Sequence, residues 1–158
     1  MKFYKITASG LGTGYSPVAP GTAGSVLGII LFWILNFALQ KADANEWFIL
    51  VLNSGVIILT MFFGVKAIKE VHKIWEHDAG KIVIDEIVGV WIAAFAVPFR
   101  WEYYLSALVL FRFFDILKPL YIRRLDNMKT NWSVMLDDVL AGIYALIVLQ
   151  LIIYFKVF

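Results

Sequence analysis

The chain has 158 residues, of which 61% are hydrophobic and 16% are charged. Soluble domains contain about 45–50% apolar and about 25% charged residues, so this composition excludes an ordinary soluble domain. The absence of cysteine excludes disulfides, thiolate metal sites and a cysteine nucleophile, and a net charge of +2 without a dense basic stripe argues against nucleic acid as a partner.

Apolar stretches recur along the whole chain, and a membrane-spanning helix needs about 20 apolar residues. The sequence predicts five spans, roughly over residues 25–40, 47–65, 82–99, 103–120 and 134–155. A loop rich in glycine and proline precedes the first span, over residues 10–24. We therefore expect an all-α fold, a polytopic integral-membrane helical bundle that forms a single membrane domain over residues 1–158.

The third and fourth spans admit two interpretations. One continuous helix would bury Arg100 and Glu102 near the middle of the membrane, which is costly. A hairpin avoids this cost, and Pro98 disfavours helical structure at the residue before it, as expected near a turn. The sequence favours the hairpin, which gives five spans and places the two chain ends on opposite sides of the membrane.

The basic residues are distributed unevenly on this topology. Of the 14 Lys and Arg residues, Lys41, Arg100 and Lys156 lie on one side and the other eleven lie on the opposite side. Cytoplasmic loops carry an excess of Lys and Arg, so the side with eleven is predicted to be the cytoplasm.

Ionisable residues gather at the cytoplasmic ends of the third, fourth and fifth spans. They are Asp85, Glu86, Arg112, Asp115, Lys118, Asp137 and Asp138. Such residues inside spans are costly, and a functional role is the default interpretation. The structural alternatives are that Asp137 and Asp138 cap a helix N-terminus, and that Asp115 pairs with Arg112 or Lys118.

Five carboxylates without cysteine or a histidine cluster suit a hard divalent cation such as Mg²⁺. Arg112 and Lys118 beside them suit a phosphate group. Small residues one turn further along, at Gly89, Ala141 and Gly142, favour close packing of the helices that carry the acids. This combination indicates phosphoryl chemistry on a lipid headgroup.

An ion-coupled transporter could use the same side chains. It would be expected to place its charges near the middle of the membrane and to show an internal repeat, which is not evident here. The loop before the first span lacks a nucleotide-binding fingerprint. Its backbone N–H groups could bind an anion or could simply form a turn at the membrane interface, and the sequence does not separate these alternatives.

Four sequence blocks carry a family resemblance. They are GYSPVAPGT at residues 14–22, IDEIVG at 84–89, FRFFDILKP at 111–119 and DDVLAG at 137–142. Each block alone is a weak signal, but the four in this order resemble the phosphatidylglycerophosphatase A family. Residues 122–126 are similar to the segment that links the family's third and fourth blocks.

The resemblance implies a Mg²⁺-dependent phosphatase in the bacterial inner membrane. Such an enzyme hydrolyses phosphatidylglycerophosphate to phosphatidylglycerol and phosphate at the cytoplasmic face. The phospholipid is then the expected partner, with no protein partner indicated and a homo-oligomer left open. A related alternative, a CDP-alcohol phosphotransferase, requires a conserved aspartate series on its helices that this sequence lacks.

With cysteine absent and no aspartyl-phosphate motif, metal-assisted attack by water is the remaining mechanism. We expect the metal ligands to be Asp85, Glu86, Asp115, Asp137 and Asp138. Among them, the residues expected to act in catalysis are Asp85, Glu86, Asp115 and Asp138. The residues expected to contact the substrate phosphate are Ser16, Thr22, Arg112 and Lys118. His77 and Asp78 are expected in a solvated loop.

Overall fold

The computed structural model describes residues 2–75, 79–128 and 130–156, and all regular structure within these ranges is helical. Three helices are long and apolar enough to cross a membrane, namely α2 (Pro20–Lys41), α3 (Glu46–Val71) and α7 (Asn131–Tyr154). The shorter helices are α1 (Lys2–Ala8), α4 (Ile84–Ala93), α5 (Trp101–Leu117) and α6 (Ile122–Asp126), with 3₁₀ turns η1 (Thr13–Tyr15) and η2 (Ala79–Lys81). The all-α prediction is confirmed.

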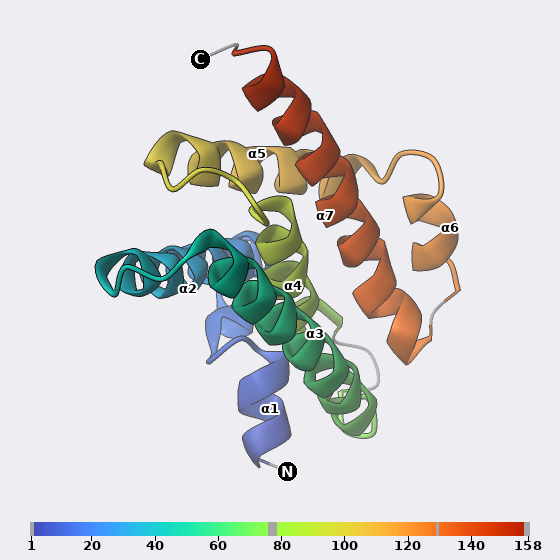
Figure 1. Cartoon of the computed structure of the whole chain (residues 1–158). Coiled ribbons are helices and arrows are strands. Elements are labelled where there is room, and N and C mark those ends of the chain that lie inside the picture. The colour runs from blue at the N-terminus through green and yellow to red at the C-terminus, as the bar shows by residue number, and fades with distance from the viewer. Residues whose placement is uncertain (1, 76–78, 129, 157–158) are drawn as a thin grey trace.

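Helix α4 lies at the centre of the molecule, packed against α2, α3, α5 and α7 (Figure 1). Eight of its ten residues are buried. A ten-residue helix is about 15 Å long, roughly half the thickness of the hydrocarbon core. The helix predicted over residues 82–99 is therefore shorter than expected: it covers only Ile84–Ala93 and is largely buried by the neighbouring helices.

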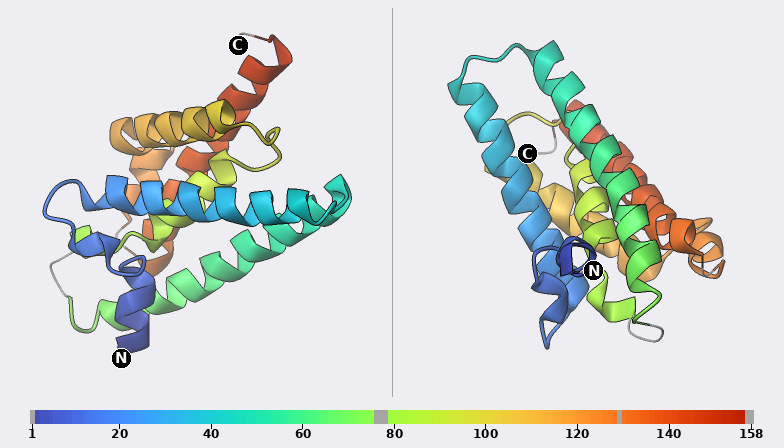
Figure 2. Two further views of the ribbon diagram at one scale, coloured as in Figure 1. Left: turned by 90° about the vertical axis from the view of Figure 1, so that its left-hand side faces the viewer. Right: turned by 90° about the horizontal axis from the view of Figure 1, so that it is seen from below.

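The chain leaves the helical conformation after α4 and re-enters it at α5. Ala96 adopts a left-handed conformation with φ of 55°, and Pro98 follows two residues later. A continuous helix through Arg100 and Glu102 is thus excluded, and the predicted reversal of the chain is present. Figure 2 shows α2 and α5 running in opposite directions, so the beginning of α2 and the end of α5 lie on the same side of the molecule.

Helices α4 and α7 meet through two glycines. A Cβ atom on Gly142 would collide with the carbonyl oxygen of Gly89, and a Cβ atom on Gly89 would lie 2.8 Å from the carbonyl oxygen of Asp138. Only residues without a side chain permit this approach. The predicted close packing is confirmed, and it places the first turn of α4 beside the Asp137–Asp138 turn of α7.

Helix α2 begins earlier than the sequence indicated. Pro20 is its first residue, where the fixed φ of proline favours a helix start, so residues 20–24 are helical and not part of the preceding loop. Gly24 packs directly on the residue before α4, since a Cβ atom there would lie 2.7 Å from Cβ of Val83. The beginnings of α2 and α4 are therefore in contact.

Candidate metal and phosphate site

A cavity of about 360 Å³ lies where the beginnings of α2 and α4 meet the end of α5 and the first half of α7. Its charged lining residues are Asp85, Glu86, Arg112, Asp115, Lys118, Asp126, Asp137 and Asp138. All of these except Asp126 are predicted from the sequence. The fold brings these seven residues together from α4, from α5 and the residue that follows it, and from α7.

Three of these carboxylates form a cluster, which we call the acidic cluster: Asp85, Glu86 and Asp138. Each offers one oxygen, and these oxygens lie within 4.8 Å of one another. Asp85 is 7% exposed and Asp138 is 4% exposed, and Oε2 of Glu86 is buried without a hydrogen-bond partner. Among the described residues, no Lys or Arg forms an ion pair with any member of the cluster.

Two buried carboxylates and a third that is partly buried, none of them in an ion pair, are unfavourable together unless a cation or a proton compensates their charge. Carboxylate oxygens are the ligands that hard divalent cations prefer. The residues of the acidic cluster therefore fit a metal ion. Asp85 and Glu86 also lie in the first turn of α4, where the positive end of the helix dipole stabilises negative charge.

Capping does not explain the acids of α7. This helix begins at Asn131 and is capped by Thr130, whose side-chain oxygen accepts a hydrogen bond of 2.9 Å from the backbone N–H of Ser133. Asp137 and Asp138 lie about two turns further along, where the backbone N–H groups are already bonded within the helix. The capping interpretation of this pair is wrong.

Arg112 and Asp115 form a largely buried ion pair within α5, with 2.6 Å between Nη1 and Oδ2. The same Nη1 atom lies 3.4 Å from Oγ of Ser25, as a long hydrogen bond to α2. Nε of Arg112 is buried and donates to no acceptor. Because an unpaired buried guanidinium N–H favours an anionic acceptor, this atom suits a phosphoryl oxygen.

Lys118 follows the last residue of α5 and lies between two carboxylates. Its Nζ atom is 2.5 Å from Oδ1 of Asp126 and 2.9 Å from Oδ2 of Asp137. Its ammonium group donates hydrogen bonds to both carboxylates, which hold it in place. Lys118 is therefore a fixed positive charge at the edge of the cavity.

The beginning of α2 closes the cavity with a glycine. A Cβ atom on Gly21 would collide with Oε1 of Glu86 and would lie 3.1 Å from Nη1 of Arg112. The carbonyl oxygen of Gly21 accepts a hydrogen bond of 2.8 Å from Oγ of Ser25. Neither residue was assigned a role from the sequence, where a Gly-to-Ser spacing of one helical turn carries no distinctive signal.

The structure does not bring every predicted residue to this cavity. Oγ of Ser16 donates a hydrogen bond of 2.8 Å to the carbonyl oxygen of Val18, and neither Ser16 nor Thr22 lines the cavity. Asp126 has no expected role, although it lies in the segment that resembles the family's link between its third and fourth blocks. Its contact with Lys118 and its place in the cavity lining reveal it. His77 and Asp78 lie outside the described residues.

Known proteins are similar to this chain over nearly its whole length. A model of the family described as phosphatidylglycerophosphatase A matches residues 6–153. The chain is 39% identical over 155 residues to "Phosphatidylglycerophosphatase A" of Haemophilus influenzae, covering 94% of this chain and 88% of that protein. It is 34% identical over 143 residues to the protein of the same name in Escherichia coli, covering 89% and 77%.

A third relative carries a different name. The chain is 42% identical over 147 residues to a protein of Bacteroides thetaiotaomicron named "Putative phosphatidylinositol-3-phosphatase", covering 91% of this chain and 89% of that protein. No solved structure matches the chain. The match over nearly the whole sequence, and over every helix that lines the cavity, shows that the chain belongs to the phosphatidylglycerophosphatase A family.

Proposed function

We propose that this protein is a Mg²⁺-dependent lipid phosphatase that hydrolyses phosphatidylglycerophosphate to phosphatidylglycerol and phosphate. The observation that carries the proposal is one cavity that combines the three unpaired carboxylates of the acidic cluster with two cationic side chains, in a chain of the phosphatidylglycerophosphatase A family. The phospholipid is the proposed partner.

Asp85, Glu86 and Asp138 would hold Mg²⁺ through carboxylate oxygens. When bound, Mg²⁺ supplies Lewis acidity to the phosphoryl group and its attacking water. Asp115 and Asp137, which the sequence placed in the same ligand set, instead have cationic partners in Arg112 and Lys118. We propose that these two aspartates hold the cations in position.

Arg112 and Lys118 would bind the phosphoryl oxygens, Arg112 through the unpaired Nε atom and Lys118 as a compact charge. In the reaction the water oxygen bonds to phosphorus, and the bond from phosphorus to the glycerol oxygen breaks. The glycerol oxygen gains a proton, and a carboxylate of the cavity takes the proton that the water loses. Arg112 and Lys118 would stabilise the negative charge that develops on the phosphoryl oxygens.

We further propose that the chain crosses the bacterial inner membrane five times, with the cavity on the cytoplasmic side. Helices α2, α3 and α7 would be full spans, and α5 with its 17 residues is near the lower limit of length. The third crossing would be made by α4 together with the non-helical segment of residues 94–100 that follows it, because α4 alone is too short. The excess of Lys and Arg on the side of the cavity supports this orientation.

A second substrate follows from the relative in Bacteroides thetaiotaomicron, whose name specifies phosphatidylinositol 3-phosphate. That lipid also carries a phosphate monoester on its headgroup, so the acidic cluster and its two cations suit both molecules. The two lipids differ in the alcohol that hydrolysis releases, which belongs to a glycerol in one and to an inositol ring in the other.

The test is phosphate release by the purified protein in detergent from three substrates, each with Mg²⁺ or with excess chelator. The substrates are phosphatidylglycerophosphate, phosphatidylinositol 3-phosphate and the soluble monoester glycerol 3-phosphate. We expect Mg²⁺-dependent release that is fastest from phosphatidylglycerophosphate. Faster release from the inositol lipid would reassign the substrate, and release from none of them would contradict the proposed function.

A further inference from the structure

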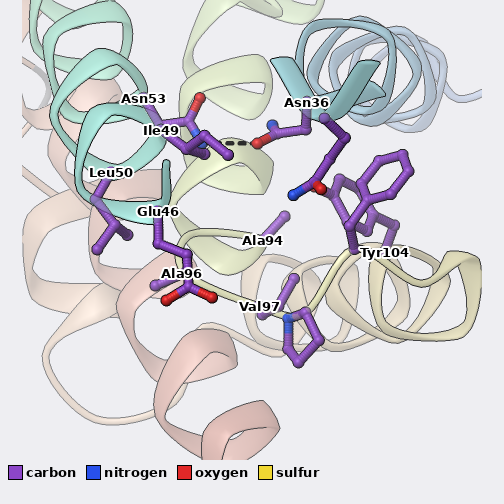
Figure 3. Close-up of a pocket in the computed structure, with 12 residues that line it drawn as sticks. Asn36, Glu46, Ile49, Leu50, Asn53, Ala94, Ala96, Val97 and Tyr104 are labelled. Atoms are coloured by element: carbon purple, nitrogen blue, oxygen red, sulfur yellow. Dashed lines mark hydrogen bonds between the residues drawn. The ribbon is translucent and has the colours of Figure 1, made fainter. Parts of the chain in front are cut away.

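A second cavity, of about 330 Å³, lies near the other end of α2, between the end of that helix, the beginning of α3 and the turn that joins α4 to α5 (Figure 3). Its polar lining residues are Asn36, Gln40, Glu46, Asn53 and Tyr104. Gly21 of the first cavity and Asn36 of this one are both on α2, and at 1.5 Å per residue they are about 22 Å apart. The second cavity is therefore separate from the acidic cluster.

An asparagine pair forms one wall of this cavity. Nδ2 of Asn53 donates a hydrogen bond of 3.0 Å to Oδ1 of Asn36, whose Nδ2 donates in turn to the carbonyl oxygen of Phe32 at 2.9 Å. Asn53 is 3% exposed, and its Oδ1 atom is buried without any hydrogen-bond partner. Such an unpaired acceptor costs free energy unless a donor reaches it. Figure 3 shows this oxygen pointing away from Glu46, so the pair shapes the wall of the cavity and does not share a ligand with that carboxylate.

Glu46 contributes a negative charge to the same cavity. It is the first residue of α3, two turns or about 10 Å before Asn53 along the helix. Its carboxylate forms no ion pair with any described residue, and no Lys or Arg lines the cavity. Glu46 is thus the one charged residue of the lining, and its negative charge favours a cationic group.

Aromatic rings complete the wall. Phe99 lines the cavity and stacks on Trp33 with 4.2 Å between ring centroids, and Tyr104 contacts Trp33 edge-on at 4.8 Å. Rings of this kind attract cations through their faces. The cavity lies at the ends of two membrane-spanning helices, where lipid headgroups lie, and not in the middle of the apolar layer.

We propose that this cavity binds the primary ammonium group of a zwitterionic phospholipid headgroup. The carboxylate of Glu46 would bind the ammonium through a charge-assisted hydrogen bond, and the ring of Phe99 would cover the cation. This site is distinct from the one that would bind the phosphate monoester. It does not rest on the proposed function.

The test is calorimetric titration of the delipidated protein in detergent with short-chain phosphatidylethanolamine, phosphatidylcholine and phosphatidylglycerol, and with free ethanolamine. The variant Glu46→Gln removes the charge and keeps the side-chain shape. The matched control is Asp43→Asn, which removes a charge from the adjacent loop outside the cavity, at a left-handed residue that asparagine tolerates.

We expect phosphatidylethanolamine to bind more tightly than phosphatidylcholine, which has no N–H donor. Glu46→Gln should weaken that binding by about tenfold or more, as for the loss of one charge-assisted hydrogen bond, and Asp43→Asn should not. Weaker binding of free ethanolamine than of the lipid would support a headgroup as the source. Equal binding of the ethanolamine and choline lipids, equal effects of the two variants, or tighter binding of free ethanolamine or of phosphatidylglycerol would each overturn the proposal.

Discussion

Nζ of Lys118 lies 2.9 Å from Oδ2 of Asp137, which joins the end of α5 to the first half of α7 at the edge of the cavity. The neighbouring Asp138 has no such partner and belongs to the acidic cluster. Successive residues of a helix point about 100° apart, so two adjacent aspartates face different groups. The structure thereby separates residues that look equivalent in the sequence, and it predicts different consequences for their replacement.

Replacing Asp137 by asparagine should alter substrate binding more than metal binding. Lys118 loses one of its two carboxylate partners and its position, so we expect the KM for phosphatidylglycerophosphate to change by about tenfold while the Mg²⁺ concentration for half-maximal rate stays unchanged. Steady-state kinetics at several Mg²⁺ concentrations measures both quantities. A marked rise in the required Mg²⁺ would instead place Asp137 among the metal ligands.

Replacing Lys118 by methionine keeps the length of the side chain and removes its charge. We expect kcat/KM to fall by about tenfold to a hundredfold, because a charged contact to a phosphoryl oxygen is lost. Thermal melting in detergent shows whether the variant still folds. A folded variant with full activity would remove Lys118 from the phosphate site.

Gly21→Ala should disable the site without disrupting the fold. The added Cβ atom collides with Oε1 of Glu86 and crowds Arg112, so the acidic cluster and its neighbouring cation must both shift. A displacement of about 1 Å in a catalytic site costs about a hundredfold in rate. Gly55→Ala is the matched control, since a Cβ atom there meets no atom within 4 Å. Equal activity of the two variants would show that the close contact at Gly21 has no catalytic importance.

The orientation in the membrane can be read from single cysteines, because the chain contains none. An impermeant thiol reagent applied to intact cells should label Asp43→Cys and should not label Asn127→Cys, which lies after α6 on the side of the cavity. Permeabilised cells should label both, which serves as the control. The reverse pattern in intact cells would contradict the proposed cytoplasmic location of the site.

Most of the candidate site was predictable because charge inside an apolar chain is a strong signal. Asp85, Glu86, Arg112, Asp115, Lys118 and the α7 aspartates stand out by their cost in a membrane, and the hairpin places them on one side. Their division into an acidic cluster and two ion-paired aspartates was not predictable. It depends on which way each side chain points: the Gly89–Gly142 contact brings Asp138 beside α4, whereas Asp115 pairs with Arg112 within α5.

The lengths of the helices were harder to predict. The apolar run of residues 82–99 looks like a span, but apolarity alone does not distinguish burial in lipid from burial in protein, and α4 is the second case. Pro20 could have shown where α2 begins, since proline favours the first position of a helix. For Ser16 the hydroxyl group suggested phosphate binding, whereas the structure pairs it with the carbonyl oxygen of Val18.

The central claim is that the acidic cluster binds the divalent cation on which lipid phosphate hydrolysis depends, and Mg²⁺ titration of phosphate release tests it most directly. The comparison is between the unchanged protein, Asp138→Asn and Asp43→Asn, each assayed on phosphatidylglycerophosphate and checked for folding by thermal melting. Asparagine keeps the volume of the side chain and removes one anionic ligand. We predict that Asp138→Asn lowers the maximal rate by about a hundredfold or more and raises the Mg²⁺ requirement, while Asp43→Asn changes neither. A folded Asp138→Asn variant with a near-native rate and an unchanged Mg²⁺ dependence would contradict the account.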